Sequence, residues 1–302
     1  EAPHFYLEEI RDEVVSAVRR VAPQAKLILG GAGVNVAPHS TMTYLGADHA
    51  LVGEGEEAMV ELLDALDRGE PIGGLPGVLS PNGHRGLTVL GGVEPSAGRA
   101  RLRQLGAPFH AQAWRWLDLD AYRSRGTPYP IQTKRGCALS CSYCLYNTLE
   151  GRQYRLRRPA EVVDEIEEAC EHGVRSFDFV DSTFNLPVEH ARAVCDELSV
   201  RDLPVALSTM GLNPAGVTPA LVAALQRARF ESVMCTPESA SAITLRSLGK
   251  GFGVVEVERA AALLREAELP TYWFFLLGAP GETVATVTET LAFCERHIPD
   301  HH

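Results

Sequence analysis

Apolar residues in the first third of the chain follow a helical spacing at two places and form short continuous runs at two others. Residues 5–21 and 57–67 carry apolar side chains three or four positions apart, which predicts amphipathic helices. Apolar runs at 27–29 and 50–52 each end in glycines, which predicts buried strands that enter glycine turns. Two successive units of strand, turn and helix indicate a doubly wound α/β domain, whose ligands lie beyond the carboxyl ends of its strands.

From residue 128 onward, short apolar runs alternate strictly with helical patterns. Strands are predicted at 129–133, 176–181, 204–209, 231–235 and 271–277. Helices are predicted at about 160–171, 188–199, 217–228, 254–267 and 283–296. This alternation indicates right-handed parallel β/α units, which carry their chemistry at the carboxyl ends of the strands.

The two halves are joined by a stretch rich in glycine and proline, within residues 69–127, which predicts a loop-rich connector. We therefore expect three parts, an α/β domain over 1–92, a connector over 93–127 and a second α/β domain over 128–302.

The segment GCALSCSYC, residues 136–144, places Cys137, Cys141 and Cys144 in a C-x3-C-x2-C spacing. Three thiolates can bind three irons of a [4Fe-4S] cluster and leave the fourth iron open, whereas an electron-carrying cluster normally has four. A structural zinc site fits less well, because it needs four ligands, usually in two pairs, and no second C-x2-C pair occurs in the chain. A disulfide framework is typical of small secreted proteins and fits a chain of 302 residues with seven cysteines poorly.

This cysteine spacing, with Tyr143 directly before the last cysteine, resembles the signature of radical S-adenosylmethionine (SAM) enzymes, which implies that Tyr143 contacts the cofactor. The resemblance implies that SAM chelates the open iron and that one electron from the cluster cleaves SAM to a 5'-deoxyadenosyl radical. It also implies a partial (β/α)6 barrel over residues 128–302, of which five units are expected before His302. An electron donor such as flavodoxin or ferredoxin is a further expectation.

Two strand ends resemble the positions at which this family binds SAM. FVDSTFN places Asp181 and Ser182 where the methionyl amino group is received, and a carboxylate that accepts from an ammonium makes a strong, charge-assisted bond. CTPES places Glu238 and Ser239 where the ribose hydroxyls are bound. An alternative for Asp181 and Glu238 is that they are helix N-caps or first-turn acids.

Two further segments complete the expected SAM site. LLGAPGET resembles the turn that packs against adenine, which implies contacts from Gly278 and Pro280. Lys250, in RSLGKGF, is a candidate cation for the SAM carboxylate.

The glycine turns of the first domain carry a second resemblance. LILGGAGVNVAP followed by DHALVGEGEEAMVELL resembles the C-terminal half of the cobalamin-binding, Rossmann-like domain that precedes the barrel in one large radical SAM subfamily. There the turns let the backbone approach the corrin tail, which implies cobalamin contacts from Gly30, Gly31, Gly53, Glu54 and Gly55. The alternative is that these turns need glycine for positive φ alone. We expect a fragment that lacks the start of this domain and the end of the barrel.

Composition limits the partners. A net charge of -11 argues against nucleic-acid binding through a broad phosphate-contacting surface. No run of about 18 apolar residues occurs, so no transmembrane segment is predicted. Seven cysteines without a recognisable secretory segment indicate the cytoplasm.

The subfamily resemblance implies a reaction. Its most usual chemistry is methyl transfer to an unactivated carbon, in which the radical abstracts a substrate hydrogen and methylcobalamin supplies the methyl group. We therefore expect a cobalamin-dependent methyltransferase acting on a small-molecule, lipid or peptide substrate. The alternatives are a radical rearrangement or cyclisation without methylation, and a non-catalytic cofactor-binding fragment.

Overall fold

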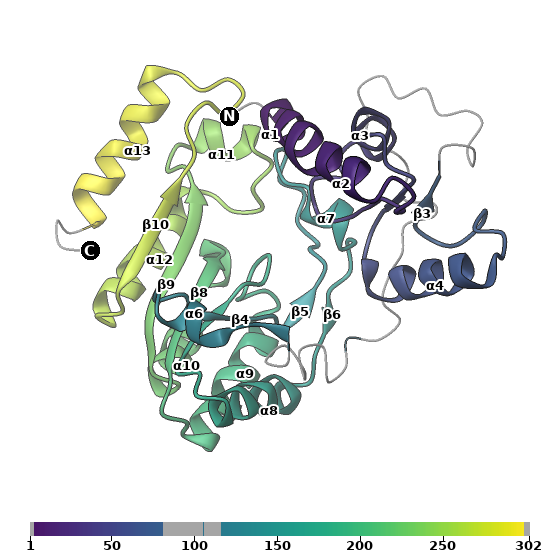
Figure 1. Ribbon diagram of the computed structural model, residues 1–302. Helices are drawn as coiled ribbons and strands as arrows, with labels where there is room; N and C mark the ends of the chain where they lie inside the picture. The colour runs from purple at the N-terminus through teal and green to yellow at the C-terminus, as the bar shows by residue number, and fades with distance from the viewer. Residues whose placement is uncertain (1–2, 81–104, 106–115, 299–302) are drawn as a thin grey trace. The chain divides into compact units, whose positions relative to one another are not determined.

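The computed structural model describes residues 3–80, 105 and 116–298 (Figure 1). Most of the connector predicted over 93–127 lies outside these residues. Within them, no helix combines the length and the apolar character needed to cross a membrane.

The chain divides into two compact units. The first consists of Glu1–Gln104 with Thr148–Glu150, and the second of Leu105–Asn147 with Gly151–His302. The boundaries predicted from the sequence at residues 92 and 127 stay predictions.

The first unit contains a three-stranded sheet in the order β1-β2-β3, in which β1 and β2 are parallel and β3 is antiparallel to β2. The strands are β1 (Ile28–Leu29), β2 (His49–Leu51) and β3 (Val78–Leu79). The helical segments are α1 (Pro3–Glu9), the π-helix η1 (Ile10–Val15), α2 (Ser16–Val21), α3 (Pro38–Leu45) and α4 (Gly55–Arg68). The helix predicted over 5–21 and both predicted strands are confirmed, whereas α3 was not predicted.

Both faces of this small sheet are covered. Ala50 of β2 packs in one buried cluster with Met42 of α3, and the next residue, Leu51, packs in another with Leu62 of α4. Successive strand side chains point to opposite faces, so the two helices lie on opposite sides of the strand. The layers confirm an α/β arrangement.

The second unit contains a five-stranded parallel sheet in the order β10-β9-β8-β7-β4. Figure 1 labels β10, β9, β8 and β4 of this sheet. Its strands are β4 (Tyr129–Ile131), β7 (Ser176–Phe179), β8 (Ala206–Leu212), β9 (Phe230–Glu238) and β10 (Thr271–Phe275). The long helices between and after them are α8 (Pro159–Glu171), α9 (Val188–Arg201), α10 (Pro219–Arg227), α12 (Val254–Glu266) and α13 (Val284–His297). All five predicted strands and all five predicted helices are present.

Shorter elements were not predicted. They are β5 (Lys134–Arg135), β6 (Arg155–Leu156), α6 (Leu119–Arg123), α7 (Tyr146–Leu149), the 3-10 helix η2 (Pro214–Gly216) and α11 (Ala242–Ser247). The strands β5 and β6 pair antiparallel, as a small separate sheet.

The helices cover one face of the large sheet. Phe177 and Phe179 of β7 are fully buried in one cluster with Ile166 of α8 and Val194 of α9, while Asp178, between them, points to the other face. Burying each phenylalanine stabilises the unit by about 1.5–3 kcal/mol. Because the strands are parallel, the loops that follow β4, β7, β9 and β10 all leave the same edge of the sheet.

Candidate functional site

The cysteine loop begins directly after β5, and all three of its cysteines are free thiols. Cys137 is buried, and Cys141 and Cys144 are partly buried. The backbone N–H of Cys137 donates to the carbonyl of Gly151 (2.9 Å). Gly136 has φ +92°, and a Cβ there would lie 2.0 Å from the carbonyl oxygen of Gln153, so only glycine fits. The base of the loop is therefore held against the segment that leads into β6.

The far side of the loop rests on the turn that follows α11. The N–H of Ser142 donates to the carbonyl of Leu248 (2.9 Å). Gly249 has φ +67°, and a Cβ there would lie 2.9 Å from the carbonyl oxygen of Ser140. Two turns from different parts of the chain thus enclose the cysteines.

The thiols share one electrostatic environment. Burial raises the pKa of Cys141, Lys250 opposes this shift, and Cys144, Glu238 and Cys137 add to it. Bound iron would relieve the mutual repulsion among neighbouring thiolates. Within residues 3–80 and 116–298, no three His, Cys, Asp or Glu side chains are gathered so that they could hold a metal ion. The fit of a cluster therefore rests on the donor set, three unpaired thiols on one loop.

Three of the predicted SAM contacts come together beside this loop. Tyr143 donates from its hydroxyl to Glu238 Oε1 (2.7 Å) and accepts from Lys250 Nζ (2.9 Å). Lys250 also forms an ion pair with Glu238 Oε2, and the side chains of both are more than nine-tenths buried. Since Lys250 and Glu238 also influence the pKa of Cys141, this group of three lies next to a predicted cluster ligand.

Glu238 has a strained backbone. Its φ is +62°, in the left-handed region that non-glycine residues rarely adopt, and it lies at the end of β9. Such a conformation costs about 1–3 kcal/mol and is concentrated at functional sites. The alternative that Glu238 caps a helix is wrong, because α11 begins after Ser241 as its N-cap.

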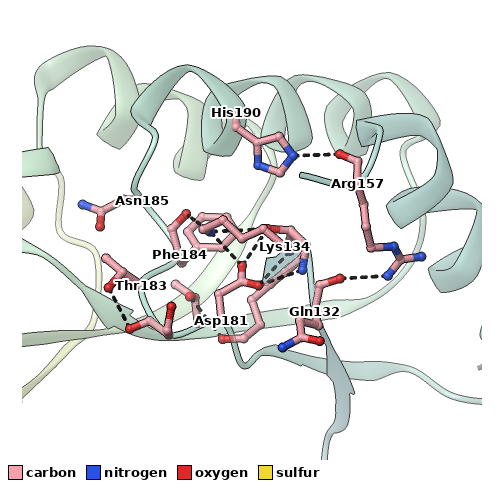
Figure 2. Close-up of polar contacts among 12 residues, drawn as sticks. Gln132, Lys134, Arg157, Asp181, Thr183, Phe184, Asn185 and His190 are labelled. Carbon is pink, nitrogen blue, oxygen red and sulfur yellow. Dashed lines mark hydrogen bonds and ion pairs between the residues drawn. The ribbon is translucent and has the colours of Figure 1, made fainter. Parts of the chain in front are cut away.

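Asp181 does not join this group. Figure 2 shows its carboxylate facing Lys134, beneath the helix that carries His190. The carboxylate accepts from Thr133 N (2.8 Å), Thr133 Oγ1 (2.7 Å), Lys134 N (3.2 Å) and Lys134 Nζ (3.2 Å), and the side chain is fully buried. These four donors occupy both oxygens, so the prediction that Asp181 receives the amino group of SAM is corrected. Nor is it a helix cap, because α9 begins after Pro187.

The serines that follow the two acids also have protein partners. Ser182 Oγ donates to the carbonyl of Gly136 (3.3 Å), immediately before Cys137. Ser239 is 1% exposed, lies 3.1 Å from Thr290 Oγ1 and accepts from the N–H of Ser241 (3.0 Å). The predicted ribose contact from Ser239 is therefore corrected, because its hydroxyl is buried and engaged within the fold.

The predicted adenine turn lies next to Glu238. Leu276 donates from its N–H to the carbonyl of Glu238 (2.9 Å), and Gly278 follows two residues later. Gly278 and Pro280 are exposed, and the N–H of Gly278 donates to Glu282 Oε2 (2.6 Å), which closes the turn. Their contact with adenine stays a prediction.

In the first unit, a residue that the sequence did not single out joins the two glycine turns. Asn35 accepts from the N–H of Gly53 at Oδ1 (2.7 Å) and donates from Nδ2 to the carbonyl of Gly31 (2.9 Å). Asn35 is only 3% exposed, and Gly31 and Gly53 both have positive φ. Its position inside the LILGGAGVNVAP segment was the available signal. The loops after β1 and β2 thus form one connected structure.

The other predicted cobalamin contacts differ in their surroundings. Gly30 is exposed, and an added Cβ would meet nothing within 4 Å. Glu54 is buried and precedes α4 as its N-cap without a capping bond from its side chain, and Gly55 is the first residue of that helix. Their role toward cobalamin stays a prediction.

Comparisons with known proteins show the family of the chain. Residues 131–294, more than half of the chain, match the radical SAM superfamily. The chain is 25% identical over 287 residues to an uncharacterized methyltransferase of Pyrococcus horikoshii, covering 94% of this chain and 60% of that protein. It is 28% identical over 317 residues to the anaerobic magnesium-protoporphyrin IX monomethyl ester cyclase of Cereibacter sphaeroides, covering 99% and 48%.

Among solved structures, the radical SAM methyltransferase TsrM of Kitasatospora setae, with tryptophan and a SAM analogue bound, superposes with a TM-score of 0.78 at 26% identity. A second structure of TsrM, with cobalamin and a [4Fe-4S] cluster bound, gives 0.77 at 25% identity. Each alignment covers 96% of this chain and 56% of TsrM. The chain thus spans about half to three fifths of the length of these relatives.

The match with the superfamily covers the cysteine loop, the ends of β7 and β9, and the turn after α11. The family implies a [4Fe-4S] cluster and SAM, and the three thiols together with the Tyr143, Glu238 and Lys250 group are the candidate residues for them. The chain belongs to the radical SAM superfamily and is related to its cobalamin-binding methyltransferases.

Proposed function

We propose that this chain carries the cofactor-binding part of a cobalamin-dependent radical SAM methyltransferase. The observation that carries the proposal is the pair of glycine turns tied by Asn35 in the first unit, in the same chain as the cysteine loop. The similarity to TsrM extends over 96% of the chain and therefore includes both units, and one TsrM structure contains cobalamin and the cluster.

In the proposed site, Cys137, Cys141 and Cys144 hold the cluster, which supplies the electron for SAM cleavage. Lys250 offers its ammonium to the carboxylate of SAM, and Glu238 accepts from the ribose hydroxyls. These two side chains also form an ion pair with each other. When SAM binds, its carboxylate would pair with Lys250 and its ribose hydroxyls would donate to Glu238. Each buried charge would therefore keep a polar partner.

The cobalamin contacts belong to the turns of the first unit. Gly31 and Gly53 carry no side chain there, and Asn35 fixes their separation through one hydrogen bond to each. A cradle that is already ordered loses less conformational freedom when a ligand binds. Asn35 is thus proposed to organise the backbone that approaches cobalamin.

A second reaction is favoured by one specific observation. The magnesium-protoporphyrin ester cyclase is 28% identical over 99% of this chain, and its name describes ring formation instead of methylation. Cyclisation is therefore the alternative reaction. For either reaction, we propose a small-molecule, lipid or peptide substrate, a flavodoxin- or ferredoxin-type electron donor and a cytoplasmic location.

The test of the cobalamin proposal is equilibrium dialysis with hydroxocobalamin. We expect weak but measurable binding by the wild-type chain. Asn35→Ala should bind at least about tenfold more weakly, because the two backbone turns lose the side chain that joins them. Asn213→Ala is the matched control, since Asn213 is also buried but lies in the second unit and accepts from the N–H of Ala215. No binding by the wild type, or equal binding by the Asn35 variant, would contradict the proposal.

A further inference from the structure

Two adjacent residues in the loop after β7 hold the short segment that leads into Cys137. Asp181 Oδ1 accepts from the backbone N–H groups of Thr133 (2.8 Å) and Lys134 (3.2 Å). Ser182 Oγ donates to the carbonyl of Gly136 (3.3 Å). Of the four residues that precede Cys137, three are therefore fixed from the loop after β7.

The side chain of Lys134 strengthens this attachment. It is fully buried, and its Nζ donates to Asp181 Oδ2 (3.2 Å) and to the carbonyl of Phe184 (2.9 Å), while lying 5.8 Å from the centre of the Phe184 ring. Figure 2 shows Lys134 between Asp181 and Phe184. A buried ammonium is tolerated only when it is paired and hydrogen-bonded, so Lys134 can occupy few other positions.

The attachment continues on the opposite side of the segment. Arg157 donates from its backbone N–H to the carbonyl of Thr133 (3.0 Å) and from Nη1 to the carbonyl of Gln132 (2.8 Å). Arg157 is itself buried and paired with Glu165 (2.7 Å). The backbone before Cys137 is thus held between two buried ion pairs, and Lys134, one member of the first pair, belongs to the segment itself.

We propose that Asp181 and Lys134 are positioning residues for the cluster ligand Cys137. They fix the backbone three residues before that thiol, and Asp181 acts through these contacts instead of binding SAM. Ligands of a cofactor need to be held within about 0.5 Å of their productive position, which a loop alone rarely achieves. The inference rests on membership of the radical SAM superfamily and is independent of methyl transfer and of cobalamin.

The test is a graded series of variants that all remove the buried ammonium. Lys134→Met keeps the carboxylate and its backbone contacts. Asp181→Asn combined with Lys134→Met keeps one acceptor oxygen, and Asp181→Leu combined with Lys134→Met keeps none. Replacing both charges of a buried pair with apolar groups generally preserves folding. Each protein is reconstituted anaerobically with iron and sulfide, and its iron content and the paramagnetic resonance of the reduced cluster are measured before SAM is added.

We expect all three variants to hold less iron than the wild type, because each loses the ammonium that joins Asp181 to the carbonyl of Phe184. The Asn combination should hold less than Lys134→Met, and the Leu combination should hold less than half of the wild-type iron with an altered resonance. Asn185→Leu is the matched control. Asn185 is fully buried in the same loop after β7, but its side-chain amide forms its hydrogen bonds with the backbone of Asn213, in the loop after β8 (2.9 and 2.8 Å). We expect this control to lower Tm and to keep its iron and its resonance.

Three outcomes would overturn the inference. If iron content and resonance stay constant across the series and only SAM affinity falls, Asp181 binds SAM and does not position Cys137. Constant iron, resonance and SAM affinity would leave the pair without a role at the cluster. An equal loss of iron in Asn185→Leu at the same Tm would mean that iron content follows stability alone.

Discussion

Glu238 combines a strained backbone, a buried charge and contacts with two other candidate site residues. Its left-handed φ is maintained by strand pairing, because it lies opposite Phe275 and its carbonyl accepts from Leu276 N–H. Its carboxylate binds both Tyr143 and Lys250. Strain that the surrounding fold maintains at a buried carboxylate is typical of a ligand-binding residue.

Glu238→Gln tests this role, because it keeps the shape of the side chain and removes its charge. We expect SAM affinity to fall by about 1.5–3 kcal/mol, the contribution of hydrogen bonds to charged groups, while the cluster stays intact. Isothermal titration of the reconstituted protein with SAM measures the change.

Glu256→Gln is the control for Glu238→Gln. It makes the same substitution at the start of α12, where the carboxylate accepts from the N–H of Gly253 (2.9 Å). A lower Tm with unchanged SAM affinity in Glu238→Gln would show that Glu238 is a structural residue.

The sequence predicted some of these residues and missed others for definable reasons. Tyr143, Glu238 and Lys250 were found because each lies in a recognisable segment: Tyr143 beside the cysteines, Glu238 after a predicted strand and Lys250 in RSLGKGF. Lys134 was not predicted, since a lysine is almost never fully buried and its partner Asp181 is 47 positions away in the sequence. Asn35 was missed because its amide joins two turns that come together only in the folded sheet.

At the scale of elements, the cysteine loop depends on the turn that follows α11. This turn supplies the carbonyl of Leu248 to Ser142 N–H and brings Gly249 against the carbonyl of Ser140. It then leads directly to Lys250, so one short turn both supports the loop and places the cation of the candidate SAM site.

Gly249→Ala is therefore expected to disturb the loop. The left-handed φ of +67° costs an alanine about 1–2 kcal/mol, and its Cβ would push against Ser140. We expect iron incorporation and SAM affinity to fall together, measured by iron content and titration. Gly251→Ala is the control, since an added Cβ there meets nothing within 4 Å. Equal effects of the two substitutions would contradict the proposed support.

The long elements were predictable, and the short ones were not. Alternating apolar runs and helical patterns identified β4, β7, β8, β9 and β10 with the helices that follow them. The strands β5 and β6 have two residues each, too few for a periodic pattern. The apolar run predicts a strand that ends at residue 235, whereas β9 reaches Glu238, because Thr236 is not apolar and proline is uncommon within a strand.

At the scale of the whole molecule, parallel strand order explains how distant segments form one site. The loops after β4, β7, β9 and β10 leave the same edge of the sheet, so residues from positions 137 to 282 can serve one cofactor. The first unit has its own sheet and its own pair of joined turns. The proposal that the first unit binds cobalamin can therefore be tested independently of the cluster.

The central claim is that Cys137, Cys141 and Cys144 hold a [4Fe-4S] cluster with one iron open to SAM. Anaerobic reconstitution followed by paramagnetic resonance of the reduced protein, with and without SAM, tests it most directly. We expect about four irons per wild-type chain and a resonance that changes when SAM is added.

Two cysteine variants, assayed for the cluster and for formation of 5'-deoxyadenosine, decide the assignment. Cys141→Ala should abolish reductive cleavage of SAM to 5'-deoxyadenosine, because a cluster ligand is lost. Cys170→Ala is the matched control, since Cys170 is also a partly buried free thiol whose pKa is raised by burial, but it lies in α8. It should retain the cluster and the cleavage. A Cys141→Ala protein that still forms 5'-deoxyadenosine, or a wild-type resonance unchanged by SAM, would contradict the account.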